Sequence, residues 1–526
     1  MATQEPAPGS SRAVRRPTAL DKDLPRPAQR DVNGVAAVVE FRFGAAWAAL
    51  LLLGACTATG SSGPTAAKSD AAAHKTPLLA GLDPDADLDP FPSTYRPGPS
   101  RPAAVVGATI LTATGQEIVN GVVVMSGGRI ASVGPAGTPT PAGATLIDGR
   151  GKWVTPGVID IHSHMGDYPV PSVPSRSDGN ELTDPNTAQV WAEHSVWPQD
   201  PAFDRSRAGG VTTLEILPGS GNLFGGRSVV LKNVTATTVG AMKFPGAPYD
   251  LKMACGENPK RVYGSKGRAP STAMGNVAGY RAAWLAAQDY RRKWDEYRAK
   301  VGRGVAADPP TRNLQLDTLV GVLKGDIRIQ NHCYRADEMA TMIDISHEFG
   351  FHIAAFHHAV ESYKIAPLLK REGICSVMWA DWGGFKMESF DSTEANAALV
   401  QRVGACTIIH SDDDYIDQHL NQEAAIAMAA GARAGIPVSH ADAISWITAN
   451  PARALGIFKE TGSLEPGKAA DLVVWSTDPF SVYALAEHVF IDGAQVYDRA
   501  HPAQPRSDFE LGQPAQGAFT PQGTMP

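Results

Sequence analysis

The chain has 526 residues, of which 43% are hydrophobic and 19% are charged, a composition typical of a globular protein with a large core. Its formal net charge of -7 is small for this length, and no basic stripe with interleaved aromatic residues occurs, which argues against a nucleic-acid partner. The length favours two or more domains, although one α/β barrel alone uses about 250 residues.

An apolar run at residues 43–53 follows Arg42 and ends in L-G-A-C at 53–56. The run is too short to span a bilayer and is typical of a secretory signal. The tetrapeptide resembles a bacterial lipobox, which implies cleavage before Cys56, a lipid anchor on that cysteine, and export to the periplasm or cell surface. A plain signal peptide or a chance apolar run is the alternative. Residues 1–56 are thus predicted to be a disordered extension followed by a lipoprotein-type signal.

Two further segments have the composition of unfolded chain. Residues 57–99 are rich in Thr, Ser, Gly and Ala and then in Pro and Asp, which predicts a flexible linker. Residues 501–526 are rich in Pro, Gln and Gly, which predicts a disordered tail.

Short runs rich in Val and Ile follow the linker, and the sequence Ser126-Gly127-Gly128 between two of them is a hairpin signal. Runs of the same kind return near the C-terminal end, at 467–475 and 488–497. Strands this short need partners to be stable. We therefore predict that residues 100–155 and 458–500 pair into one small β-sandwich.

The middle of the chain, residues 156–457, alternates apolar runs with helical stretches, which predicts βα units around a parallel sheet. The candidate strands are 158–161, 211–217, 228–231, 251–254, 327–330, 352–356, 374–377 and 406–409. Eight strands are the number that closes a TIM-type (β/α)8 barrel. Aromatic residues at helical spacing in 278–300 predict a helix docked on this barrel, with a lid over the active site as the alternative.

The five cysteines show no C-x-x-C pair and no regular spacing. Cys255, Cys333, Cys375 and Cys406 lie in or beside apolar runs. We expect them to be buried thiols that pack as small hydrophobic side chains.

Histidines occur where the predicted strands end. His162 and His164 follow the first apolar run at i and i+2, so their side chains project to the same side. His332 ends the fifth strand, His357-His358 end the sixth, and Asp412 follows the eighth. The C-terminal ends of barrel strands meet at one mouth, and imidazole suits zinc and its neighbours in the periodic table. The pattern predicts a metal site.

Five segments resemble the amidohydrolase superfamily, most closely its imidazolonepropionase-related members, over residues 105 to 498. They are V-T-P-G-V-I-D-I-H-S-H (154–164), H-H-A-V-E-S-Y-K (357–364), I-I-H-S-D-D (408–413), A-I-S-W-I-T-A-N-P-A-R-A-L-G-I (443–457) and G-S-L-E-P-G-K-A-A-D-L-V-V-W (462–475). The resemblance implies a metal-dependent hydrolase. The metal ligands that it implies are His162, His164, His332, His358 and Asp412.

A further ligand in this family is a carboxylated lysine or a glutamate from the fourth strand. Lys252 and Glu257 are both available here, and the choice between them stays open. The resemblance implies one or two divalent metal ions, with zinc as the first candidate and manganese, iron and cobalt as alternatives.

The expected reaction is hydrolysis of a C–N bond in an amide, a cyclic amide or a dipeptide-like small molecule. Its water is activated by the metal, and Asp412 serves as the general acid and base. A deaminase and a catalytically silent, surface-tethered binding module are the alternatives. Candidates for contact with the substrate are Arg227, Arg261, Tyr263, Tyr363 and His410. No membrane contact beyond the anchor at Cys56 is predicted, and a homo-oligomer is compatible with the sequence.

Overall fold

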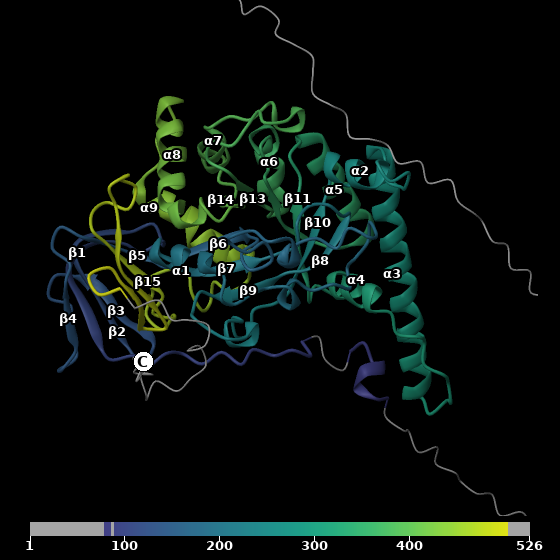
Figure 1. Cartoon of the computed structure of the whole chain (residues 1–526), viewed down its shortest axis with the longest axis horizontal. Coiled ribbons are helices and arrows are strands. Elements are labelled where there is room, and N and C mark those ends of the chain that lie inside the picture. The colour runs from purple at the N-terminus through teal and green to yellow at the C-terminus, as the bar shows by residue number, and fades with distance from the viewer. Residues whose placement is uncertain (1–77, 86–88, 503–526) are drawn as a thin grey trace, which may run out of the picture. The chain divides into compact units, whose positions relative to one another are not determined.

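The computed structural model describes residues 78–85 and 89–502, which belong to one compact unit (Figure 1). The lipobox-like segment with Cys56 and the predicted tail from residue 503 onward lie outside the described residues. Within the described ranges, no helix has both the length and the apolar character that crossing a membrane requires.

The two ends of the described chain share one eight-stranded sheet, whose blue and yellow strands lie together in Figure 1. It contains β1 (Ala103–Leu111), β2 (Glu117–Ser126), β3 (Arg129–Pro135), β4 (Thr145–Asp148), β5 (Trp153–Pro156), β15 (Leu472–Trp475), β16 (Ala486–Ile491) and β17 (Ala494–Asp498). The order is β17-β16-β15-β5-β1-β2-β3, with β4 beside β1. The antiparallel ladder between β5 and β15 joins the two ends of the chain, which confirms the predicted pairing of distant strands.

The middle of the chain forms two further sheets. The larger has the order β14-β13-β12-β11-β10-β8, and the smaller has the order β6-β7-β9. Their strands are β6 (Val158–Ser163), β7 (Val211–Ile216), β8 (Phe224–Arg227), β9 (Val229–Lys232), β10 (Asp250–Ala254), β11 (Arg328–His332), β12 (Ile353–His357), β13 (Cys375–Met378) and β14 (Thr407–Ile409).

Strands β10 to β14 pair in parallel, as the alternation of strands and helices predicts. The third candidate strand is β9, and it runs antiparallel to β7. Strand β8, which the sequence analysis missed, runs antiparallel to β10. The sequence predicted one closed ring of parallel strands. The observed strands instead form two separate sheets, each with one antiparallel pair. Single hydrogen bonds connect these sheets, from Asp412 N to His162 O at 3.0 Å and from Ser228 N to Asp250 O at 2.9 Å.

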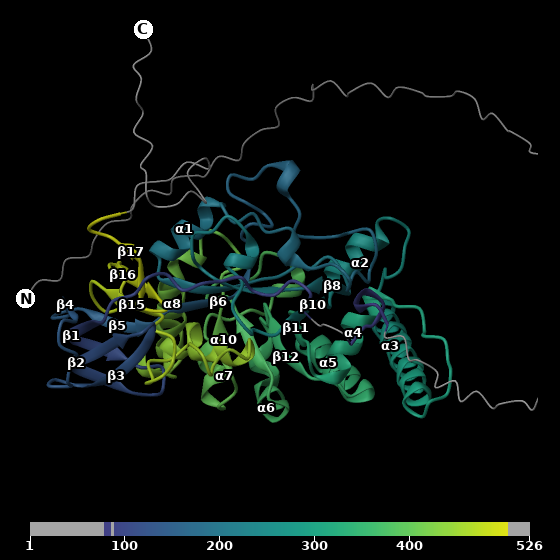
Figure 2. The same cartoon turned by 90° about the horizontal axis from the view of Figure 1, so that it is seen from below.

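Helices follow the parallel strands, and Figure 2 shows α5, α6 and α7 along one side of them. The helices are α1 (Pro201–Ala208), α2 (Glu257–Gly264), α3 (Ala273–Gly302), α4 (Leu314–Lys324), α5 (Ala336–Phe349), α6 (Ser362–Glu372), α7 (Asn396–Arg402), α8 (Leu420–Arg433), α9 (His440–Ala443) and α10 (Ala449–Ala454). The long helix α3 buries Tyr280, Trp284 and Trp294, and Trp284 packs edge-on against Phe224 of β8. This burial confirms the prediction of a docked helix and not the alternative of a lid.

The cysteine prediction is wrong. Cys255 and Cys333 form one disulfide and Cys375 and Cys406 form another, although 78 and 31 residues separate the partners in sequence. Both pairs connect neighbouring strands: Cys255 and Cys333 directly follow β10 and β11, and Cys375 and Cys406 lie at the starts of β13 and β14. The proximity arises from strand pairing, which the cysteine spacing does not reveal.

Part of the predicted linker is docked on the folded unit. Asp85 pairs with Arg298 at 2.7 Å and with Lys324 at 2.8 Å. Farther along, the buried Tyr95 donates a hydrogen bond to the Asp492 carboxylate at 2.7 Å. The aspartates that suggested a solvated tether are thus ion-pair partners of basic side chains on α3 and α4, contacts that composition alone does not predict.

Candidate metal centre

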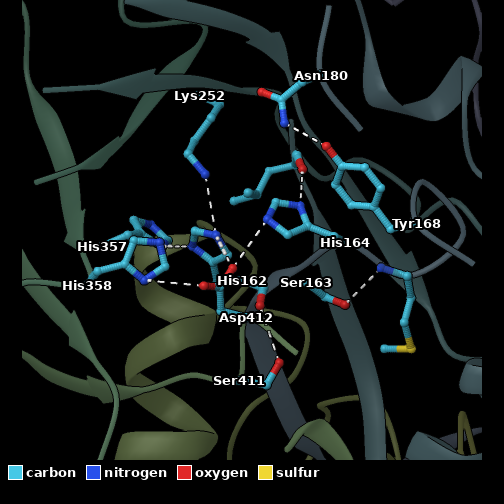
Figure 3. Close-up of polar contacts among 12 residues, drawn as sticks. His162, Ser163, His164, Tyr168, Asn180, Lys252, His357, His358, Ser411 and Asp412 are labelled. Carbon is cyan, nitrogen blue, oxygen red and sulfur yellow. Dashed lines mark hydrogen bonds and ion pairs between the residues drawn. The ribbon is translucent and has the colours of Figure 1, made fainter. Parts of the chain in front are cut away.

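Two histidines of the centre come from the end of β6. This strand is buried along its whole length, and His162 and His164 project from its C-terminal end toward Asp412 in the loop after β14 (Figure 3). The Nε2 atoms of both rings lie 3.3 Å from Asp412 Oδ1. The backbone hydrogen bond from Asp412 N to His162 O keeps the two segments in register.

The tautomers of these two rings follow from their outer hydrogen bonds, because a carbonyl oxygen can only accept. His164 Nδ1 lies 2.7 Å from Leu217 O, so Nδ1 carries the proton. His357 Nε2 donates to Gln330 Oε1 at 2.8 Å, so its Nδ1 accepts from His162 Nδ1 at 2.7 Å. The Nε2 atoms of His162 and His164 are therefore the ring nitrogens that face the Asp412 carboxylate, and Lys252 Nζ lies 3.3 Å from His162 Nε2. Two imidazole nitrogens and a carboxylate oxygen this close together fit the ligand set of a divalent cation.

Three more histidines lie close by. The His358 ring centroid is 4.4 Å from that of His162, 4.7 Å from that of His332 and 4.8 Å from that of His410. All four rings are buried. Both ring nitrogens of His332 and of His410, and Nδ1 of His358, have no hydrogen-bond partner within the described part of the chain. Buried polar atoms without partners are costly, so these nitrogens fit a metal-binding role.

The electrostatic environment keeps the imidazoles neutral and Asp412 ionised. Burial lowers the pKa of His162, His332 and His358 well below the ordinary value, and lowers that of His410 to about 3. Burial alone would raise the pKa of Asp412, but the neighbouring His358 and His164 outweigh it, and the net pKa is lowered. Neutral imidazole and carboxylate are the forms that bind metals.

Backbone conformation adds a second sign of a specialised site. His358 and Asp412 have φ values of +57° and +64°. Residues other than glycine rarely adopt a positive φ, which costs about 1–3 kcal/mol for each residue. Such residues cluster at functional sites. The two residues face each other, with His358 Nδ1 3.8 Å from Asp412 Oδ2.

Lys252 rather than Glu257 faces the centre. Lys252 is fully buried on β10, and its Nζ lies 3.3 Å from His162 Nε2 (Figure 3). Burial lowers its pKa to about 7, so much of the amine is neutral near physiological pH. Glu257 begins α2 and forms an ion pair with Lys386 at 3.2 Å, with 37% of its side chain exposed. Of the two alternatives, the geometry favours Lys252.

The groups that position these ligands were not predicted from the sequence. His357 orients His162 through the contact between their Nδ1 atoms. Asp160 accepts hydrogen bonds from His162 N at 3.1 Å and from the Ser411 backbone and hydroxyl, so it connects β6 to the loop that carries Asp412. Burial raises the pKa of Asp160 to about 7. The signals that could have suggested them are the first histidine of His357-His358, next to the predicted ligand, and the acid two residues before His162.

The predicted substrate contacts separate into different places. His410 joins the histidine cluster. Arg227 is buried, lies over the Trp191 ring at 4.2 Å and lines a cavity of about 790 Å³. Arg261 is exposed on α2. The remaining two candidates bind backbone carbonyl oxygens away from the centre, Tyr263 that of Asp184 and Tyr363 that of Asp391.

An α/β fold with imidazoles and a carboxylate gathered where its parallel strands end is typical of metal-dependent enzymes. Comparison with known sequences identifies the group: the model of the Amidohydrolase family matches residues 153–499, and the chain belongs to this family. Imidazolonepropionases match over shorter segments, in agreement with the resemblance seen in the motifs.

Individual relatives agree with this assignment. The amidohydrolase tasK of Hapsidospora irregularis is 32% identical over 375 residues, 68% of this chain, but the match spans 38% of that longer protein. The 5-methylthioadenosine/S-adenosylhomocysteine deaminase of Symbiobacterium thermophilum is 25% identical over 75% of this chain and 93% of its own length. An amidohydrolase structure from Thermotoga maritima superposes with a TM-score of 0.69 and 35% identity over 76% of this chain and 100% of that one.

Proposed function

We propose that the chain is a metal-dependent amidohydrolase that cleaves a C–N bond in an amide, a cyclic amide or a dipeptide-like small molecule. The observation that carries the proposal is the approach of the Nε2 atoms of His162 and His164 to within 3.3 Å of the Asp412 carboxylate. Membership of the Amidohydrolase family supports the same reaction class.

The residues that would hold a divalent ion, zinc first among the candidates, are His162, His164, His332, His358 and Asp412. His410, with both nitrogens without described partners, is an additional donor. Such an ion would act as a Lewis acid on the scissile carbonyl group and would lower the pKa of water, so that hydroxide is available to attack at neutral pH.

Asp412 would transfer the protons. Its side chain is 22% exposed, so substrate and solvent can reach it, while the pKa lowered by His358 and His164 keeps it ionised and able to accept a proton. It would take a proton from the attacking water and return it to the leaving nitrogen. Because an amine leaves poorly unless it is protonated, this second transfer is required for C–N cleavage.

Lys252 would provide a carboxylated side chain. Its amine is fully buried and has a pKa near 7, so a neutral nitrogen is available to add to carbon dioxide. The product would place a carboxylate beside His162 and so allow a second metal ion. Mass spectrometry of the intact protein under native conditions tests this step by the added mass of one carbon dioxide, which Lys252→Arg should abolish.

The central test combines metal analysis with turnover. Purified protein loaded with zinc or manganese should bind at least about one ion per chain and hydrolyse members of a panel of N-acyl amino acids, dipeptides and lactams. Asp412→Asn should abolish turnover while largely preserving metal content, and Asp413→Asn is the matched control. Less than about one ion per chain would favour the silent binding module instead.

A deaminase is the second candidate, supported by the similarity to the Symbiobacterium thermophilum deaminase over nearly its whole length. Release of ammonia from 5′-methylthioadenosine, without hydrolysis of any amide on the panel, would favour it. The buried Lys252 at the centre supports amide hydrolysis, because the proposed second ion depends on it.

We further propose that the two middle sheets are the parts of one (β/α)8 barrel and that the terminal sheet folds into a small β-sandwich. The apolar cluster that contains Val105, Ile110, Leu472, Val474 and Phe490 supports the second point. The boundaries predicted from the sequence, 156–457 for the barrel and 100–155 with 458–500 for the sandwich, stand as part of this proposal.

We also propose export with a lipid anchor on Cys56. Two disulfides support an oxidising compartment, because they are rare in the reducing cytosol. The wild-type chain should fractionate with membranes, and Cys56→Ala should release it into the soluble fraction. Equal fractionation of both would remove the anchor from the proposal.

A further inference from the structure

The metal centre is accessible from one edge. The side chains of His164 and Asp412 are 17% and 22% exposed, while His162 and His358 are buried. Tyr168 stands beside this edge, with its ring centroid 5.7 Å from that of His164 (Figure 3). A substrate must therefore approach past His164 and Tyr168.

The cavity of about 790 Å³ lies next to that edge. Asn180, which lines it, donates a hydrogen bond to the Tyr168 hydroxyl at 2.7 Å. Pro218, which also lines it, directly follows Leu217, whose carbonyl oxygen accepts from His164. Two residues thus connect the cavity lining to the edge of the metal centre: Tyr168 contacts Asn180, and Leu217 adjoins Pro218.

Aromatic side chains form one wall of this cavity. The rings of Trp191 and His194 stack with centroids 5.8 Å apart, and Phe91 contacts both edge-on, at 5.6 Å and 4.7 Å. Phe91 is 50% exposed even though it lines the cavity, so its ring has a face available to a ligand. We define Phe91, Trp191 and His194 as the aromatic wall.

Phe91 is held in place by the folded unit. Its carbonyl oxygen accepts a hydrogen bond from Lys243 Nζ at 2.7 Å, and Lys243 is buried. The same ammonium group forms ion pairs with Asp89 at 2.8 Å and with Glu193 at 2.9 Å. Because these contacts use the backbone of Phe91 and not its ring, truncating the ring leaves the anchor intact.

From these contacts we propose that the cavity binds the part of the substrate remote from the scissile C–N bond, and that this part is aromatic. The inference rests on the proposed function, whose substrate class it narrows. A volume of about 790 Å³ is in the range that encloses a drug-sized ligand. The aromatic wall offers contacts to a ring, above all at Phe91, since Arg227 lies over the Trp191 ring. The charged side chains Arg227, Asp178 and Glu181 make a second aspect of the same cavity polar.

The test compares three neutral probes, acetamide, phenylacetamide and N-benzylacetamide, which place a ring on neither, one or the other side of the amide. Equilibrium binding to the chelator-treated full chain, measured by calorimetry, needs no turnover. One of the two aromatic probes should bind at least about tenfold more tightly than acetamide, and Phe91→Ala should remove about threefold to tenfold of that preference. Phe91→Leu should retain part of it, and Tyr483→Ala, which alters an exposed ring outside the cavity, should behave as the wild type.

Equal binding of all three probes, or a full aromatic preference in folded Phe91→Ala, would overturn the inference. His194→Ala gives an independent variant should Phe91→Ala fail to fold. Turnover of the amide panel by the zinc-loaded chain separates the two proposals. An aromatic preference in binding without turnover counts against the proposed function alone, and turnover without aromatic preference counts against this inference alone.

Discussion

The disulfide between Cys255 and Cys333 connects two strands that each carry a predicted metal ligand. Cys333 directly follows His332, and Cys255 lies three positions after Lys252. Replacing both cysteines by alanine removes the cross-link without introducing polar atoms. For a sequence separation of 78, the conformational entropy that the unfolded chain regains without the cross-link predicts a destabilisation of about 4.5 kcal/mol.

The second disulfide is the matched control. Cys375 and Cys406 lie where β13 and β14 begin, whereas Cys255 and Cys333 follow the ends of their strands. The sequence separation of 31 between Cys375 and Cys406 predicts a destabilisation of about 3.7 kcal/mol when both are replaced. The two double variants should therefore melt at similarly lowered temperatures. Zinc affinity should differ, because only the first disulfide adjoins the centre. Its loss should weaken zinc binding about tenfold or more, the effect typical of removing a group that orients a ligand.

Thermal denaturation and competition for zinc with a chromophoric chelator measure the two effects separately. Equal zinc affinity in the two double variants would refute the assignment of a positioning role to the first disulfide. Mass spectrometry after alkylation, with and without reduction, verifies that both disulfides form in the wild-type chain.

Three further predictions follow from the site and the core. Lys252→Ala should lower the number of ions bound per chain, measured by elemental analysis, whereas Glu257→Ala should not, because Glu257 pairs with Lys386. His357→Ala should weaken zinc binding about tenfold or more, because it releases the His162 ring. Gln330→Ala should also weaken zinc binding, because Gln330 holds His357, and the same chelator competition measures both variants. Trp284→Ala should destabilise the fold by about 3–5 kcal/mol in chemical denaturation because the ring is fully buried, while Leu285→Ala, at a position 58% exposed on the same helix, should change stability little.

The sequence predicted the elements whose signal is local. The period-two placement of His162 and His164 and the apolar runs before His332 and Asp412 follow from strand geometry. The structure brings His162 and His164 to Asp412, and it places His332 beside His358. The pairing of β5 with β15 was also predictable, because the short strands expected at both ends of the chain need partners to be stable.

The features that the sequence did not predict depend on contacts between distant residues. Strand β8 has the sequence F-G-G-R, and its two glycines give no strand signal. The disulfides and the docking of Asp85 and Asp89 require partners more than 30 residues away whose identity no spacing encodes. The choice between Lys252 and Glu257 depended on whether the chain turns inward after β10, and α2 begins there instead.

The placement of the ligands on the two middle sheets links metal binding to the fold. His162 and His164 belong to the end of β6 in the small sheet, whereas His332, Lys252 and His358 belong to or directly follow strands of the large one. Asp412, in the loop after β14, reaches the small sheet through its backbone hydrogen bond to His162. Strands β6 and β14 share no ladder, so an ion held by both groups would connect two sheets that backbone pairing leaves separate on this side. A ligand that binds only the folded state stabilises it in proportion to the logarithm of its concentration. The same residues that would activate water would therefore also stabilise the fold, and removal of the ion should loosen the contact between β6 and the loop after β14 before it loosens the disulfide-linked strands β10 and β11.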